Sequence, residues 1–190
     1  MRHAQVALAG SGSGDKAQRF RAAALPYLDD VYALARYLLR NTADAEDAAQ
    51  ECYLRAFRHF ETFRGGPIKP WLLAILRNVC RAEYARRVTQ PAMQADGLQA
   101  AEQCVDGLWT EGGSSPEADA LGRLDGETVQ RLIAELPDQF REAIVLREVN
   151  ELSYREIADV AGVPVGTVMS RLARARALLR AAWIAEENKS

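Results

Sequence analysis

Residues 91–123 separate two stretches of helical apolar periodicity, and this break divides the chain into two small helical domains. Glycine, serine and proline are frequent in the break, and no apolar repeat is sustained there. On both sides of it, apolar residues recur every three or four positions, the spacing of one helix face. No stretch shows the alternation of a half-buried strand. The pattern predicts an all-α chain with a flexible N-terminal tail at 1–19, a helical bundle at 20–90, a flexible acidic linker at 91–123 and a second helical domain at 124–184.

The formal net charge of −2 is the sum of segments with opposite charges. Residues 54–90 contain eight bases and two acids, whereas residues 91–140 contain ten acids and two bases. The helix predicted after Pro164 carries four arginines and no acid as far as Ala182. Clustered basic segments favour nucleic acid as a partner, although the chain as a whole is slightly acidic.

The second domain has the pattern of a helix-turn-helix unit. Ser153 and Glu156 have the spacing of a capping box at a helix start, and Gly162 suits the left-handed turn that follows. In such units the second helix enters the major groove of DNA, where arginine can read guanine. The outward side chains of that second helix are Thr167, Ser170, Arg171 and Arg174. The alternative is an ordinary helical hairpin with a solvated arginine face.

Aromatic residues are interleaved with bases in the first domain: Phe60, Phe63, Trp71 and Tyr84. A basic groove with stacking rings suits single-stranded nucleic acid. The turn that begins at Phe63 could also hold a base displaced from a duplex. The alternative is that Phe60, Phe63 and Trp71 belong to the hydrophobic core.

A predicted helix capped by Asn41 or Thr42 carries an acidic outward face, which includes Asp44, Asp47 and Glu51. Carboxylates in the first turn complement the helix dipole. The face is therefore either a solvated helix end or a docking surface for a protein partner, and composition does not decide between them.

The three cysteines, Cys52, Cys80 and Cys104, are far apart and form no metal-binding or disulfide pattern. Cys52 and Cys80 occupy apolar helix positions and are predicted to be buried reduced thiols.

We find no catalytic motif and predict no enzymatic activity, no metal and no cofactor. No segment approaches the roughly 20 apolar residues of a membrane span, which predicts a cytoplasmic protein without membrane insertion.

Four segments together resemble the extracytoplasmic-function (ECF) class of bacterial RNA polymerase sigma factors: residues 44–51, 63–66, 71–78 and 163–176. The resemblance implies two helical domains that contact the −10 and −35 promoter elements, and core RNA polymerase, promoter DNA and an anti-sigma factor as partners. A stand-alone helix-turn-helix repressor or activator is the alternative function. A third is a module that binds only a regulatory protein.

The resemblance also implies roles for individual residues. Core polymerase would bind Asp44, Asp47, Gln50, Glu51 and Leu54. The −10 element would contact Phe63, Arg64, Gly65, Trp71, Arg77, Asn78, Arg81 and Tyr84. The −35 element would contact Tyr154, Arg155, Thr167, Ser170, Arg171, Arg174 and Arg176.

Overall fold

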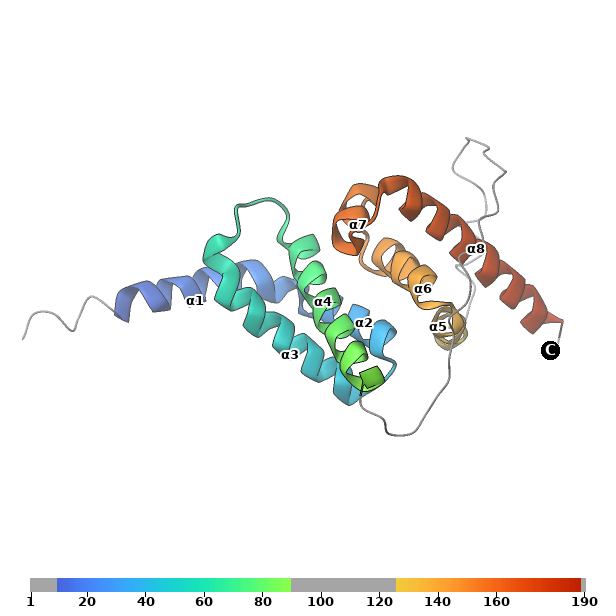
Figure 1. The fold of residues 1–190 in the computed structure, drawn as a ribbon, viewed down its shortest axis with the longest axis horizontal. Helices are drawn as coiled ribbons and strands as arrows, with labels where there is room; N and C mark the ends of the chain where they lie inside the picture. The colour runs from blue at the N-terminus through green and yellow to red at the C-terminus, as the bar shows by residue number, and fades with distance from the viewer. Residues whose placement is uncertain (1–9, 90–125, 189–190) are drawn as a thin grey trace, which may run out of the picture.

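The computed structural model describes residues 10–89 and 126–188, which we call the N-terminal and C-terminal regions (Figure 1). The N-terminal region contains α1 (Gly10–Ala24), α2 (Leu28–Leu39), α3 (Thr42–His59) and α4 (Ile68–Thr89), with short 3₁₀ turns η1 (Leu25–Tyr27) and η2 (Phe60–Thr62). The C-terminal region contains α5 (Gly126–Glu135), α6 (Asp138–Ile144), the π-helical turn η5 (Val145–Val149), α7 (Tyr154–Ala161) and α8 (Val165–Glu187). The prediction of an all-α chain with two helical regions is confirmed, since neither described region contains a strand. The predicted linker at 91–123 lies outside the described residues.

The first helix begins at Gly10, within the stretch that the apolar pattern assigns to a flexible tail. Phe20 explains the difference, because its side chain is only 7% exposed. Its ring meets three other rings edge-on, at centroid distances between 5.3 and 6.2 Å: those of Tyr53, Phe57 and Phe60. Such aromatic contacts stabilise beyond simple burial. One buried ring on an otherwise polar helix leaves too little periodicity to reveal the helix in the sequence.

The helix ends follow the predicted signals. Asn41 caps α3, and its side-chain oxygen accepts a hydrogen bond from the backbone N–H of Asp44 at 3.2 Å. Ser153 and Glu156 form both bonds of the capping box at the start of α7. Gly162 ends α7 with a φ of 65°, the left-handed conformation that the predicted turn requires.

Pro70 lies within the first turn of α4. It is the third residue of α4, because the helix begins at Ile68. Proline is still accommodated there, since the N–H groups of a helix's first turn have no intrahelical acceptor.

A single hydrophobic core runs through both regions. Its N-terminal part includes Val31 and Leu73, and its C-terminal part includes Ile144 and Val168. α4 packs against α7, while α2 packs against α6 and η5, so the two regions are in direct contact (Figure 1). The sequence pattern leaves the relative arrangement of the two domains open, and this contact is a finding of the structure.

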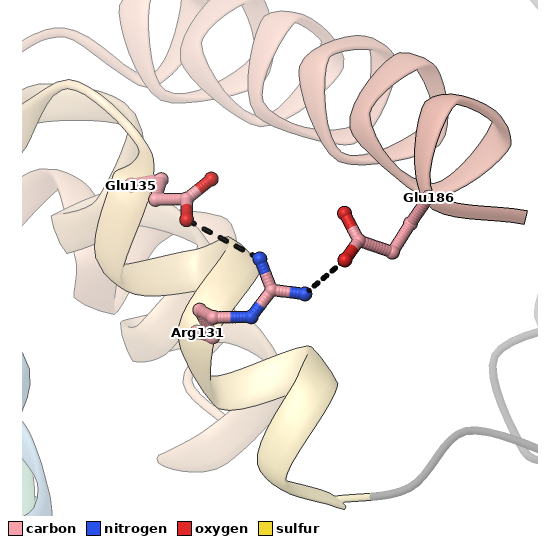
Figure 2. A network of polar contacts seen from close by, with 3 residues as sticks. All are labelled: Arg131, Glu135 and Glu186. Carbon is pink, nitrogen blue, oxygen red and sulfur yellow. Dashed lines mark hydrogen bonds and ion pairs between the residues drawn. The ribbon is translucent and has the colours of Figure 1, made fainter. Parts of the chain in front are cut away.

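Arg131 connects the two ends of the C-terminal region. It donates to the carboxylate of Glu135 on α5 at 3.4 Å and to that of Glu186 on α8 at 2.8 Å (Figure 2). These groups are largely exposed, so the pairs position α5 against α8 more than they stabilise the fold.

Cys52 and Cys80 are buried free thiols, as predicted, whereas Cys104 lies outside the described residues. Burial raises the pKa of each of the two buried thiols to about 12. Both remain protonated and act as small apolar side chains in the core. No helix in the described regions is long and apolar enough to cross a membrane.

Candidate functional site

The outward face of α8 is an open basic surface. Val168, Leu172 and Ala175 are buried and orient the helix against the C-terminal core. Arg174 is exposed and Arg171 is partly exposed, and neither pairs with a carboxylate in the part of the chain that the structure describes. Cationic side chains that have no protein partner remain available to an anionic ligand.

The start of α8 places two hydroxyl groups beside these arginines. Thr167 is partly exposed and Ser170 is exposed. The Ser170 hydroxyl donates to the backbone carbonyl of Thr167 at 2.9 Å. Its oxygen can still accept a hydrogen bond, and the Thr167 hydroxyl is also placed to contact a phosphate or a base edge. The structure thus brings all four residues predicted on this helix face onto one surface.

Tyr154 and Arg155 begin α7, the first helix of the helix-turn-helix unit. Arg155 is exposed, whereas Tyr154 is partly buried beneath a neighbouring cation. The Arg147 guanidinium lies 5.3 Å from the centre of the Tyr154 ring and donates to the carbonyl oxygen of Leu152 at 2.9 Å. Arg147 therefore positions Tyr154. It belongs to the π-helical turn η5, whose irregular register hides this contact from a periodicity argument.

Among the residues predicted to contact the −35 element, Arg176 is the one that forms an ion pair with a described side chain. It donates to the carboxylate of Glu148 at 2.9 Å. Burial alone would lower the pKa of Arg176, but its hydrogen bonds with Glu148 and Tyr154 outweigh that effect and raise it. The arginine is fully charged, and its contact with a phosphate would compete with Glu148.

The loop between η2 and α4 forms a second exposed surface. Gly65 and Gly66 have φ values of 90° and 98°, which only glycine adopts without strain. Arg64, the loop residue that follows Phe63, is exposed. The rings of Phe63 and Trp71 lie at the two ends of the loop with centroids 4.8 Å apart. Both rings are half-buried, so the loop is supported by an aromatic pair at its base.

The interpretation of the aromatic residues differs from one ring to the next. Phe60 packs against Phe20 and the core, so for this residue the core alternative is correct. Trp71 also packs against the core through part of its ring. Tyr84 is 63% exposed on α4 and is free to stack on a ligand.

The polar residues predicted on α4 do not share one environment. Asn78 and Arg81 are exposed and lie on the same side of the helix as Tyr84. Arg77 is different, because its side chain is 14% exposed and is paired with Glu142 of α6. Sequence reasoning missed Glu142, since a contact between residues so far apart leaves no local signal.

The acidic face on α3 is accessible. Asp47 and Gln50 are exposed, and Leu54 is 52% exposed two turns further along the helix. Glu51 forms an ion pair with Arg55 at 2.6 Å, and Asp44 lies in the capped first turn. The five residues predicted for this face thus lie along one edge of α3.

A hollow of about 360 Å³ adjoins this edge between α2 and α3. Its lining consists of Leu28, Asp29, Tyr32, Glu46, Ala49, Gln50 and Tyr53. Its aromatic residues, Tyr32 and Tyr53, leave no distinct signal in the sequence, because their spacing along two different helices is that of ordinary core positions.

Comparisons with known proteins match both regions. Residues 24–90 match the family described as Sigma-70 region 2, and residues 126–179 match Sigma-70 region 4. The ECF RNA polymerase sigma factor SigW of Bacillus subtilis is 34% identical over 162 residues, covering 81% of this chain and 83% of the relative. The RNA polymerase sigma-H factor of Pseudomonas aeruginosa is 34% identical over 164 residues, covering 86% and 84%.

Solved structures show the same fold. The sigma factor RpoE of Bartonella quintana, determined in complex with the anti-sigma factor NepR, superposes with a TM-score of 0.65 at 26% identity. The match covers 86% of this chain and 95% of that one. CnrH, determined with the cytosolic domain of CnrY, has a TM-score of 0.63 at 23% identity and covers 94% of this chain and 96% of its own.

Proposed function

This chain belongs to the ECF class of RNA polymerase sigma factors, and from this premise we propose how its surfaces act in transcription initiation. It binds core RNA polymerase, directs it to specific promoters and aids promoter melting. The polymerase carries out the chemistry, so the chain itself has no catalytic role. It acts in the cytoplasm, where polymerase and promoter DNA are found.

The −35 element is read by α8. The observation that carries this proposal is the surface of Arg171 and Arg174, which pair with no carboxylate of the described regions, on the second helix of a helix-turn-helix unit and opposite its buried face. Arg171 and Arg174 contact base edges, and Thr167 and Ser170 contact bases or phosphates near the helix start. Three further residues contact the DNA backbone: Tyr154, Arg155 and Arg176. This geometry favours duplex DNA, because the major groove accepts a single helix.

The −10 element is bound by the η2–α4 loop and the exposed side of α4. A base flipped out of the duplex enters at Phe63, Arg64 and Gly65, where the glycines allow the backbone to approach closely. Trp71, Asn78, Arg81 and Tyr84 line the melted strand, and the exposed Tyr84 ring supports stacking. Arg77 joins them once it is released from Glu142.

Core polymerase docks on the acidic edge of α3. The exposure of Asp47, Gln50 and Leu54 leaves this edge accessible to a protein partner, and the resemblance of residues 44–51 to the ECF class supports core polymerase as that partner. Asp44 and Glu51 complete the edge.

An anti-sigma factor is a further partner. The sigma factor RpoE of Bartonella quintana, which has the same fold, was determined in complex with the anti-sigma factor NepR. Binding would cover the polymerase and DNA surfaces and keep the factor inactive.

An in vitro transcription assay with purified core polymerase tests the function. Genomic fragments should give promoter-dependent transcripts only when this chain is added, and a variant with Arg171→Ala should give fewer. A stand-alone repressor or activator would behave differently, because it would bind a palindromic duplex tightly without polymerase. Absence of any promoter-dependent transcript would refute the proposal.

A further inference from the structure

The helices proposed to contact the two promoter elements lie against each other. α4 carries most of the −10 residues and packs against α7 of the helix-turn-helix unit (Figure 1). On a promoter the two elements are about 25 base pairs apart, which is roughly 85 Å of duplex at about 3.4 Å per base pair. Two helices in contact cannot reach both elements, so α4 and α7 have to separate on DNA.

Arg77, one of the proposed DNA-binding residues, is already paired when the two regions are in contact, which we call the closed arrangement. The Nε atom of Arg77 donates to one carboxylate oxygen of Glu142 on α6, and its Nη2 atom lies 3.4 Å from the other. The two side chains are only 14% and 11% exposed. Bidentate arginine–carboxylate pairs are strong and directional, particularly when they are withdrawn from water. While this pair is intact, the Arg77 guanidinium is unavailable to a phosphate or a base.

A second polar contact joins the two regions. Asn150 follows η5 and is 1% exposed, and its Nδ2 atom donates to the backbone carbonyl of Asp30 on α2 at 3.1 Å. The Asp30 carboxylate also pairs with Lys69 at 2.8 Å. The Oδ1 atom of Asn150 is buried and has no hydrogen-bond partner among the described groups. An unsatisfied buried oxygen favours opening, because water can then reach it.

Like charges also face each other across this contact. Burial lowers the pKa of Arg141 on α6, the positive charge of Arg40 at the end of α2 lowers it further, and the paired carboxylate of Asp138 partly offsets both effects. The contact thus combines strong polar pairs with an unsatisfied group and a repulsion. Apolar side chains of both regions also share one core at this contact, so these polar features adjust how readily it opens.

We propose that the Arg77–Glu142 pair is a latch that withholds Arg77 from single-stranded promoter DNA until the two regions separate. The proposal rests on the proposed function, because it concerns when the −10 surface is available. Glu142 acts as a positioning residue, because its carboxylate binds the Arg77 guanidinium in the way that a DNA phosphate would. DNA and Glu142 compete for the same cation, so removing the carboxylate charge should open the chain and expose α4.

The test uses the full chain with Glu142→Gln, which keeps the side-chain shape and removes the charge. Glu135→Gln is the matched control, because Glu135 pairs with Arg131 inside the C-terminal region alone (Figure 2). The radius of gyration is measured by small-angle X-ray scattering. Affinity for a fluorescein-labelled oligothymidylate of about 20 nucleotides, a sequence-neutral single strand, is measured by anisotropy.

We expect Glu142→Gln to enlarge the radius of gyration and to bind the oligothymidylate about tenfold more tightly, while Glu135→Gln matches the wild type. The double variant Arg77→Ala/Glu142→Gln should be enlarged in the same way but without the tighter binding. If Glu142→Gln resembles Glu135→Gln in both measurements, the latch does not exist. An enlarged Glu142→Gln chain whose affinity is unchanged would also overturn the proposal.

A second variant keeps the test decisive if Glu142→Gln fails to fold, as judged by circular dichroism. Asn150→Asp has nearly the same shape and places a carboxylate beside that of Asp30, so it should open the contact by repulsion. An Asn150→Asp chain that is enlarged but binds the oligothymidylate no more tightly than the wild type would overturn the latch.

Transcription with core polymerase separates the two proposals. If the wild type directs promoter-dependent transcription while neither variant opens the chain, the latch alone is wrong. If Glu142→Gln opens the chain and binds single strands more tightly but no form of the protein directs transcription, the proposed function is wrong and the latch stands.

Discussion

Replacing Gly162 with alanine should destabilise the C-terminal region, because this residue ends α7 in the left-handed conformation. Its φ is 65°, and its backbone N–H donates to the carbonyl oxygen of Ala158. A Cβ at this position would meet no atom within 4 Å, so the penalty is purely conformational. Placing an L-residue in this conformation costs about 1–2 kcal/mol. The reduced entropy of the unfolded chain offsets about 0.4–1 kcal/mol of this, which leaves a net loss near 1 kcal/mol.

Gly166 provides a matched control four residues further along the chain. It lies in the first turn of α8 with an ordinary helical backbone, and a Cβ there would also meet no atom within 4 Å. At this position alanine restricts the unfolded chain without straining the folded one, so Gly166→Ala should stabilise by about 0.5 kcal/mol. The same chemical change is thus expected to have opposite signs at two neighbouring sites.

Urea unfolding of the full chain, followed by far-ultraviolet circular dichroism, measures both changes. In a thermal melt, the same loss of 1 kcal/mol would lower Tm by about 2–4 °C for a chain of this size. Gly162→Asn should be less destabilising than Gly162→Ala, because asparagine tolerates the left-handed conformation. The reasoning is refuted if Gly162→Ala is as stable as the wild type, or if Gly166→Ala loses as much as Gly162→Ala.

Three further predictions concern single side chains. Hydrogen bonds from Ser153 lower the pKa of Glu156. The contribution of Glu156 to stability is therefore complete above the ordinary carboxyl pKa and is lost as the pH falls through the lowered value. Glu156→Gln should flatten the acid limb when the free energy of urea unfolding is plotted against pH. Arg171→Ala should reduce discrimination between correct and altered −35 sequences by roughly 5- to 150-fold, or about 1–3 kcal/mol, in filter binding with the polymerase holoenzyme. Asp47→Arg should weaken binding to core polymerase in a native gel while its melting curve stays that of the wild type, and normal binding would show that the α3 edge is not the docking surface.

The features that sequence patterns predicted are those set by neighbouring residues. The Asn41 cap, the Ser153–Glu156 capping box and the turn at Gly162 each depend on groups within five positions of one another. The inward and outward faces of α8 follow from helical periodicity in the same way. These features are recoverable because backbone conformation and local hydrogen bonds determine them almost alone.

Contacts between distant helices were not recoverable. Phe20 anchors α1 through rings on α3 and η2 that lie more than thirty positions away. Arg147 lies in the π-helical turn η5 and contacts the Tyr154 ring at the start of α7, across the loop that joins the two elements. In each case the sequence contains the residue types, but their meeting depends on how the helices pack.

The Arg77–Glu142 pair follows from the same segregation of charges along the chain that indicates a nucleic-acid-binding protein. An arginine withdrawn from water needs an anionic oxygen pair, and its planar fork fits a carboxylate and a phosphate alike. Arg77 belongs to the segment richest in bases, so in the free chain the nearest packed carboxylate, that of Glu142, satisfies it. Arg81 is one helical turn further along, faces solvent and remains exposed. The two arginines therefore differ in what controls them: salt should weaken DNA binding through Arg81 directly, whereas Arg77 responds first to the opening of the two regions.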